Sequence, residues 1–207
     1  MSSEIKVLIA DDHAVVRMGL SALLGAEDDI EVVGEAKNGE ETVREALRLM
    51  PDVVVMDLVM PEMDGIEATR QICSQVPSAH VLLLTTFSTS DGIAAALEAG
   101  AIGALMKSVE DASLIAAIRK VAAGERCIAP DVRQLLSKDP PAPKLTQRQL
   151  EILESITHGL TNRDIATKFG IRADGVNLHI MAILQKLGAA NRTEAVAIAL
   201  RKHLLKI

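Results

Sequence analysis

The sequence predicts an α/β domain with a doubly wound, five-stranded parallel sheet, followed by an all-α domain of four helices. Within the 207 residues, five short apolar runs alternate with helical patterns up to residue 124, and no strand pattern follows residue 144. Residues 1–143 carry 12 basic and 23 acidic side chains, a net charge of −11, whereas residues 144–207 carry 10 and 5, a net charge of +5. We therefore expect an acidic site in the first domain and a polyanion-facing module in the second.

The five apolar runs occupy residues 5–10, 30–35, 52–57, 80–86 and 103–106. They are continuous rather than alternating, which is typical of parallel strands that are covered on both faces. Helical patterns fill the gaps at residues 13–25, 39–50, 64–75, 89–99 and 110–123. A strand and helix unit repeated five times predicts the doubly wound fold, whose functional groups gather beyond the carboxyl ends of the strands.

Residues 1–125 form the first predicted domain, and residues 126–144 are predicted to be a linker with a short helix that starts at Pro130. The segment KDPPAPK ends this linker, and its three prolines in four residues make a stiff spacer. Residues 145–207 form the second domain, with helices expected at 146–158, 162–169, 173–187 and 192–205. The segment FGIRA joins two of these helices, which is the outline of a helix-turn-helix.

The composition excludes several classes of protein. Trp and Tyr are absent and Phe occurs twice. This excludes proteins that bind RNA or single-stranded DNA by stacking the bases on rows of aromatic rings. No apolar stretch reaches the roughly 20 residues of a bilayer helix, and no secretory signal pattern is present. We therefore expect a cytoplasmic protein without a membrane partner, in which Cys73 and Cys127 are reduced.

Polar side chains lie at the carboxyl ends of four of the predicted strands. Asp11 and Asp12 follow the first strand, Asp57 ends the third, Thr85 lies in the fourth, and Lys107 follows the fifth. Three carboxylates at one edge of a sheet favour a hard divalent cation such as Mg²⁺. With an ammonium and a hydroxyl beside them, they suggest phosphoryl transfer to an aspartate. Taken singly, these side chains could instead cap a helix, start a turn or face solvent.

The motifs IADDH, MDLVMPEMDG, LTT and GALMK, at these separations, resemble the receiver domain of bacterial two-component response regulators over residues 4–124. The resemblance implies a flavodoxin-like fold in which Asp57 accepts a phosphoryl group from a sensor histidine kinase. It implies that Thr85 is the switch hydroxyl, that Lys107 is the family's lysine, and that the domain catalyses only its own phosphoryl transfer and hydrolysis. The implied Mg²⁺ ligands are the carboxylates of Asp11, Asp12 and Asp57 and the backbone carbonyl of Val59.

One position departs from the receiver pattern. Relatives carry Tyr or Phe three residues before the lysine, where this chain has Ala104, so the usual aromatic readout of phosphorylation is missing. Phe87, two residues after Thr85, is a candidate to replace it, and a role in the core or an interface is the alternative.

Residues 145–200 resemble the LuxR-type helix-turn-helix of the NarL-like branch of response regulators. The resemblance implies that the third helix enters the major groove of double-stranded DNA and that the fourth supports a homodimer in the phosphorylated state. Helical spacing predicts that the third helix buries Val176, Ile180, Ile183, Leu184 and Leu187. The candidate DNA contacts are Arg172, Asn177, Leu178, Met181, Lys186 and Arg192, and the candidate dimer residues are Val196, Ala199 and Leu200.

The outward face of this third helix departs from the family pattern. Relatives carry Thr at the position of Gly175, Lys at that of Asn177, and a polar or basic residue at those of Met181 or Ala182. No positive charge occurs on this face before Lys186, so weak or altered DNA binding is an alternative to ordinary binding by this family.

The sequence suggests three alternative functions. The first is a transcription regulator that is switched by phosphorylation of Asp57. The second is an interaction protein that is switched in the same way and contacts another protein through Leu178 and Met181. The third is a haloacid-dehalogenase-type phosphatase, which would need a second aspartate where Val59 stands and is therefore disfavoured.

Overall fold

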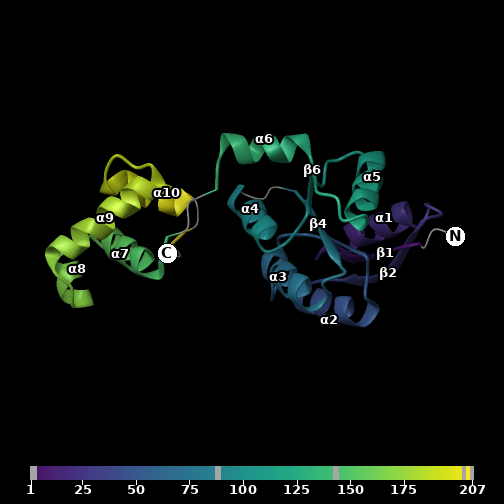
Figure 1. Cartoon of the computed structure of the whole chain (residues 1–207), viewed down its shortest axis with the longest axis horizontal. Helices are drawn as coiled ribbons and strands as arrows, with labels where there is room; N and C mark the ends of the chain where they lie inside the picture. Colours follow the sequence, from purple (N-terminus) through teal and green to yellow (C-terminus); the bar gives the residue numbers. More distant parts are fainter. Residues whose placement is uncertain (1–3, 87–89, 142–144, 202–203, 206–207) are drawn as a thin grey trace. The chain divides into compact units, whose positions relative to one another are not determined.

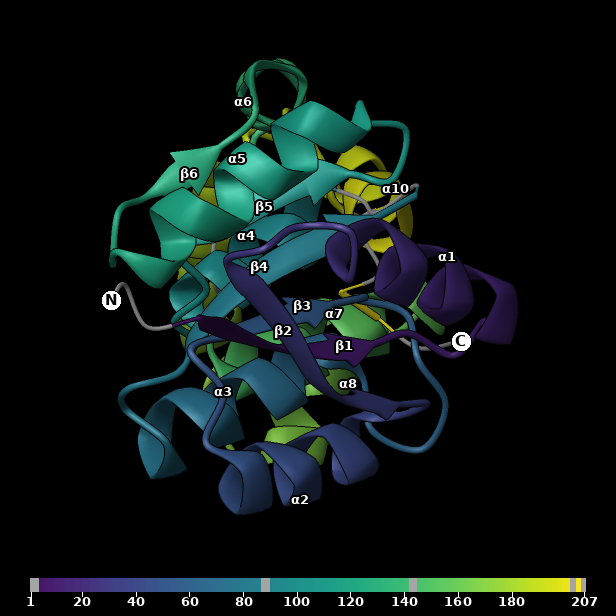
Figure 2. The same ribbon diagram turned by 90° about the vertical axis from the view of Figure 1, so that its right-hand side faces the viewer.

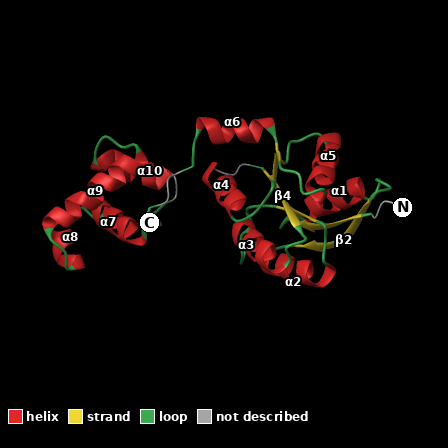
Figure 3. Cartoon of the chain, viewed as in Figure 1, coloured by secondary structure: helices red, strands yellow, loops and turns green. Residues whose placement is uncertain are grey.

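The computed structural model describes residues 4–86, 90–141, 145–201 and 204–205 of the chain. It divides into two compact units, Met1–Pro141 and Ala142–Ile207. Figures 1 and 3 show strands and helices in the first unit and helices alone in the described part of the second. The predicted fold classes, α/β followed by all-α, are therefore confirmed. Among the described residues, no helix is long and apolar enough to cross a membrane.

The first unit contains a parallel sheet with the strand order β2-β1-β3-β4-β5-β6. The strands are β1 (Ile5–Ala10), β2 (Ile30–Ala36), β3 (Val53–Met56), β4 (His80–Thr85), β5 (Gly103–Met106) and β6 (Cys127–Ile128). The prediction of five strands was wrong by one. The two residues of β6 pair with Gly103 and Ala104, and such a short strand leaves no apolar run that a sequence pattern could detect.

Helices cover both faces of this sheet because successive strand residues point to opposite sides. On β1, for example, Leu8 and Ala10 join one buried cluster while Val7 and Ile9 join the other. Figure 2 shows α2 and α3 on one side of the sheet and α5 on the other. The helices on the first side are α2 (Gly39–Leu49), α3 (Gly65–Gln75), α4 (Ser90–Glu98) and α6 (Pro130–Lys138); those on the second are α1 (Ala14–Leu24) and α5 (Asp111–Ala122).

Residues 127–138, which the sequence suggested as part of a linker, belong to the first unit. They form β6 and α6, and Val132 of α6 is 0% exposed in the same buried cluster as Ile93 of α4. The Ser90 hydroxyl donates to an Asp139 carboxylate oxygen at 2.8 Å, which ties α4 to the end of α6. An amphipathic pattern shows that a helix has an apolar face, but not what covers it. Residues 142–144 of the proline-rich spacer lie outside the described residues.

The second unit contains α7 (Gln147–Thr157), α8 (Asn162–Phe169), α9 (Ala173–Leu187) and α10 (Arg192–Arg201). Thr146 and Thr161 begin α7 and α8 with capping boxes, in which the threonine side chain and the third helical residue each accept a backbone N–H. Gly170 and Gly188 end α8 and α9 with φ of +62° and +63°, a conformation that glycine adopts without strain. The last helix ends at Arg201 rather than at the predicted residue 205, since Leu204 and Leu205 are not helical.

Candidate functional site

The acidic side chains meet where the strand order reverses. Strands β1 and β3 are neighbours, with Ala10 aligned with Met56, so Asp11 and Asp57 leave the sheet side by side. The N–H of Asp57 donates to the Ala10 carbonyl at 2.8 Å, which fixes this approach. Both carboxylates are almost fully buried, with Asp11 2% and Asp57 5% exposed. The crevice beyond such a reversal is where open parallel sheets place their ligands.

Lys107 enters the same crevice from the end of β5. Its N–H donates to the Thr85 carbonyl at 2.7 Å, and its Nζ lies 2.5 Å from Asp11 Oδ2 and 2.6 Å from Asp57 Oδ2. Burial favours the neutral amine, but the hydrogen bonds and the charges of Asp11 and Asp57 outweigh it and raise the pKa of Lys107 above its usual value. The ammonium therefore stays charged between two carboxylates.

Asp12 and His13 complete the cluster at its solvent side. His13 Nδ1 lies 2.7 Å from Asp12 Oδ1 and 3.3 Å from Asp11 Oδ1. One ligand atom from each of Asp11, Asp12, His13 and Asp57 lies within 4.8 Å of the others. Three carboxylates supply the hard oxygen donors that Mg²⁺ prefers, so this donor set fits such an ion.

A cavity of about 310 Å³ opens beside these groups. Its lining consists of Asp12, His13, Val16, Asp57, Val59, Thr86 and Lys107. Thr85 ends β4 and is 2% exposed, whereas the exposed hydroxyl residue on the cavity wall is Thr86. Sequence reasoning named Thr85 as the switch residue and did not name Thr86, which directly follows β4. The paired threonines of the LTT motif were the available signal.

The loop after β3 holds Asp57 through close backbone contacts. A Cβ at Gly65 would lie 2.1 Å from the Asp57 carbonyl oxygen, so only glycine fits there. The N–H of Gly65 also donates to the Leu58 carbonyl at 3.0 Å. Within this loop Glu62 has a φ of +67°, which is unusual for a residue with a side chain.

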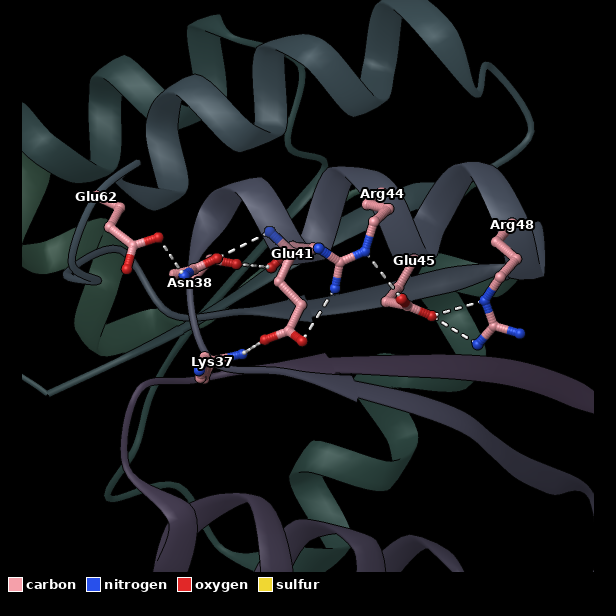
Figure 4. Close-up of polar contacts among 8 residues, drawn as sticks. Lys37, Asn38, Glu41, Arg44, Glu45, Arg48 and Glu62 are labelled. Carbon is pink, nitrogen blue, oxygen red and sulfur yellow. Dashed lines mark hydrogen bonds and ion pairs between the residues drawn. The ribbon is translucent and has the colours of Figure 1, made fainter.

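Asn38, the N-cap of α2, helps to hold this loop. Its Oδ1 accepts the N–H of Glu41 at 2.8 Å, and its Nδ2 donates to Glu62 Oε2 at 2.7 Å, as Figure 4 shows. Asn38 is 5% exposed, whereas its partner Glu62 is exposed. The loop that carries the phosphoacceptor candidate is thus fastened to α2 as well as to α3.

The position that lacks the aromatic residue is well packed. Ala104 is 1% exposed and belongs to the same buried cluster as Ile93 of α4 and Val132 of α6. Its carbonyl accepts the N–H of Ala129, which directly precedes α6. Helix α6 is therefore anchored beside this site. Phe87, the candidate replacement, lies outside the described residues.

The second unit presents α9 with one buried and one outward face. Val176, Ile180, Ile183 and Leu187 are buried as predicted, and Leu184 is half-buried against the same cluster. Leu178 and Met181 are 68% and 66% exposed. Arg172, the N-cap residue of α9, is also exposed.

Three of the polar candidates for DNA contact are engaged inside the second unit. Asn177 Oδ1 accepts from Asn162 Nδ2 at 2.5 Å, and Asn162 Oδ1 accepts from Arg192 Nη1 at 2.8 Å. Lys186 Nζ donates to Gln149 Oε1 at 2.9 Å, next to the capping box of α7. Sequence reasoning missed Asn162 and Gln149, since no motif marks a hydrogen bond between residues 15 or more positions apart.

The predicted dimer residues on α10 differ in exposure. Ala199 is 0% exposed and packs in the core of its own unit, so it is not available to a second chain and that assignment is corrected. It lies four positions after Ala195, which is also buried, so both face inward on one helical stripe. Leu200 is 36% exposed and Val196 is half-buried.

Comparison with known families matches both units. Residues 7–119 match the response regulator receiver domain, and residues 143–199 match the luxR family of bacterial regulatory proteins. The transcriptional regulatory protein LiaR of Bacillus subtilis is 44% identical over 209 residues, which span 97% of this chain and 99% of LiaR.

Two solved structures are similar over nearly the whole chain. The crystal structure of the response regulator ChrA from a heme-sensing two-component system has 39% identity and a TM-score of 0.59, and the match covers 99% of this chain and 100% of ChrA. A complex of the two-component response regulator RcsB with DNA has 25% identity and a TM-score of 0.68, covering 97% of this chain and 99% of RcsB.

Proposed function

The chain belongs to the response regulators that join a receiver domain to a luxR-type DNA-binding domain, and from this premise we propose that phosphorylation of Asp57 controls its binding to DNA and hence transcription. The observation that carries the proposal is the cluster at the end of β1 and β3. A buried carboxylate there lies 2.6 Å from a charged ammonium and beside two further carboxylates. Such a group can attack phosphorus while the cation neutralises the phosphoryl oxygens.

In this mechanism a sensor histidine kinase supplies the phosphoryl group. A carboxylate oxygen of Asp57 forms the new O–P bond as the N–P bond of the donor phosphohistidine breaks. Lys107 then pairs with a phosphoryl oxygen in place of the carboxylate oxygen that it holds now. Asp11, Asp12 and Asp57, with the backbone carbonyl of Val59, would hold Mg²⁺, which supplies positive charge beside the phosphoryl oxygens.

The phosphoryl group changes the charge balance of the crevice. It adds about −1.5 to −2 charge and three acceptor oxygens. A threonine hydroxyl can donate to one of them, and Thr85 remains the predicted switch residue while Thr86 lines the cavity. Either hydroxyl would pull on the segment that leads into α4, which packs against α6.

The second unit would bind double-stranded DNA with α9, as a homodimer when Asp57 is phosphorylated. The luxR-family match and the net charge of +5 over residues 144–207 support this assignment. The similarity to RcsB, which was solved bound to DNA, supports it further. We assign the protein to the cytoplasm, where a kinase and DNA are both accessible, and we assign no catalysis beyond phosphoryl transfer to and hydrolysis at Asp57.

Labelling of the full-length chain by a small acyl phosphate with Mg²⁺ tests the assignment. Asp57→Asn should abolish incorporation of phosphate, because the amide is a far weaker nucleophile than the carboxylate. Asp52→Asn is the matched control, because Asp52 precedes the same strand at its opposite end and accepts the N–H of Lys6. Labelling that persists in Asp57→Asn would place the phosphoacceptor elsewhere.

A second candidate function rests on the outward face of α9. Leu178 and Met181 are large, exposed and apolar, and such pairs also occur where proteins contact proteins. In that case phosphorylation would switch a protein complex and the second unit would bind DNA weakly or not at all. Binding of the phosphorylated full-length chain to random DNA at low salt distinguishes the two functions.

A further inference from the structure

The outward face of α9 carries two large apolar side chains where a groove-binding helix meets base edges. Leu178 and Met181 are three positions apart and therefore project from the same side of the helix. They are 68% and 66% exposed, whereas Val176 and Ile180 on the opposite face are 0% and 8% exposed. Helical periodicity keeps the two side chains out of the core, so their methyl and thioether groups face solvent.

The polar side chains beside this pair are held by other parts of the unit. Asn177 accepts a hydrogen bond from Asn162, which in turn accepts one from Arg192 at 2.8 Å. Lys186, further along the helix, donates to Gln149 at 2.9 Å. Each hydrogen bond restrains the orientation of its side chain, so turning that side chain toward a base costs free energy. The large exposed apolar side chains of the outward face are Leu178 and Met181, and Asn177 and Gln185 are exposed beside them.

We propose that α9 reads DNA through apolar contacts of Leu178 and Met181 with the C5-methyl groups of thymines in the major groove. This inference rests on the proposed function, in which the second unit binds double-stranded DNA. The thymine methyl is the one apolar group that a standard base pair shows in the major groove. If a guanine or cytosine stood at the same place, the apolar side chains would remove water from its polar groups without offering a hydrogen bond. This lowers the affinity for sites with guanine or cytosine at that position.

The charges of the second unit favour DNA over a protein as the occupant of this face. Its exposed cations include Arg163 and Lys168 on α8 and Arg172 at the start of α9. These can contact phosphates, which position a helix without reading sequence. Affinity would then come from phosphate contacts and specificity from Leu178 and Met181.

The test uses the full-length chain treated with a small acyl phosphate and Mg²⁺, and sites selected from random double-stranded DNA. Each thymine of a selected site is then replaced by deoxyuridine, which keeps its base pairing and loses only the C5-methyl group. We expect one or two positions in each half-site at which this replacement weakens binding about fourfold, the effect of losing one buried methyl. All other thymines should be insensitive.

Variants assign each methyl to its side chain. In Leu178→Ala or Met181→Ala, the ratio of the affinities for thymine and deoxyuridine sites should fall to about one at the thymine that the lost side chain contacts. Met18→Ala is the matched control, because Met18 is 69% exposed but belongs to α1 in the first unit, and this variant should keep the native ratio.

Several outcomes would overturn the inference, and they are distinguishable from failure of the proposed function. Selected sites that tolerate deoxyuridine everywhere, or a methyl dependence that survives both α9 variants, would overturn the thymine readout and leave DNA binding intact. No selected DNA even at low salt would overturn both. Loss of a partner protein in Leu178→Ala, without any DNA binding, would assign the face to protein recognition.

Discussion

The crevice at the end of β1 and β3 and the outward face of α9 differ in how their polar groups are used. In the crevice, Asp11, Asp57 and Lys107 come from three strand ends, and the Lys107 ammonium lies 2.5 Å from Asp11 Oδ2 and 2.6 Å from Asp57 Oδ2. On α9, Asn177 and Lys186 are hydrogen-bonded to partners within their own unit, and the large exposed apolar side chains are Leu178 and Met181. The charged groups of the crevice meet at one point, whereas Asn177 and Lys186 of α9 are each hydrogen-bonded to a different side chain of their own unit.

This difference shows how reliably a motif predicts a site. Parallel strands deliver the residues after their carboxyl ends to one edge, and the pairing of β1 with β3 then places Asp11 beside Asp57. A helix distributes its residues around a cylinder, and each polar side chain reaches whatever lies nearby. The availability of an outward residue is therefore set by neighbours such as Asn162 and Gln149, which lie far away in sequence.

The largest effect is expected from a substitution of Gly65, which packs against the backbone of Asp57. Gly65→Ala should lower the free energy of unfolding of the first unit by about 3–4 kcal/mol, since its Cβ would meet the Asp57 carbonyl oxygen, and it should reduce phosphate incorporation. Urea denaturation followed by circular dichroism measures the first effect. Gly19→Ala, with nothing within 4 Å of its Cβ in α1, should be neutral or stabilising. Equal stability of the two variants would contradict the close approach.

The next prediction concerns the concentrated charge itself. Lys107→Met should destabilise the first unit by about 2 kcal/mol without Mg²⁺, because two buried carboxylates would face each other without a cation. Added Mg²⁺ should restore more stability to this variant than to the native chain. Lys120→Met, which changes an exposed lysine of α5, should do neither. The outcome that would sink this idea is an Mg²⁺ response no larger in Lys107→Met than in Lys120→Met.

A smaller effect is expected in the second unit, from the loss of the Asn162 side chain. Asn162→Ala should lower its free energy of unfolding by about 1 kcal/mol, because it removes the acceptor of Arg192 and the donor to Asn177. Hydrogen exchange of the α8 and α9 amides in the full-length chain measures this loss. Gln185→Ala, an exposed change on α9, is the control and should stay within about 0.5 kcal/mol of the native value. Unchanged protection in Asn162→Ala would show that Asn177 and Arg192 are free for other contacts.

The smallest predicted effect is a pH dependence at the start of α8. The hydrogen bond from the Thr161 hydroxyl is the main reason why the pKa of Asp164 lies below the ordinary value of 3.8. The capping box is therefore fully formed above pH 3.8 and is lost as the pH falls through the lowered pKa. Asp164→Asn should lower the melting temperature slightly near neutral pH, and the difference from the native chain should shrink in acid. Asp174→Asn, in the first turn of α9, is the control, and a difference that grows in acid would reverse the assigned sign.

Much of the fold was accessible from pattern alone because apolar runs and helical periods repeat so regularly in the first unit. The predicted α9 matches the structure at both ends, and so do β1 and β5. The two-residue β6 and the packing of α6 were not accessible, because neither depends on a local pattern. Val132 is buried only because α4 and the edge of the sheet lie beside it.

The sequence by itself determined the alternation of strands and helices up to residue 124, the placement of Asp11, Asp57 and Lys107 at strand ends, and the family to which the chain belongs. These follow from local periodicity and from residues placed at strand ends, which survive in any correct fold of the chain. The tertiary structure alone decided that Thr86 lines the cavity, that Ala199 lies in the core, and that Asn177 is tied to Asn162. Each of these depends on which distant side chain comes within hydrogen-bonding or packing distance, and only the folded backbone sets that distance.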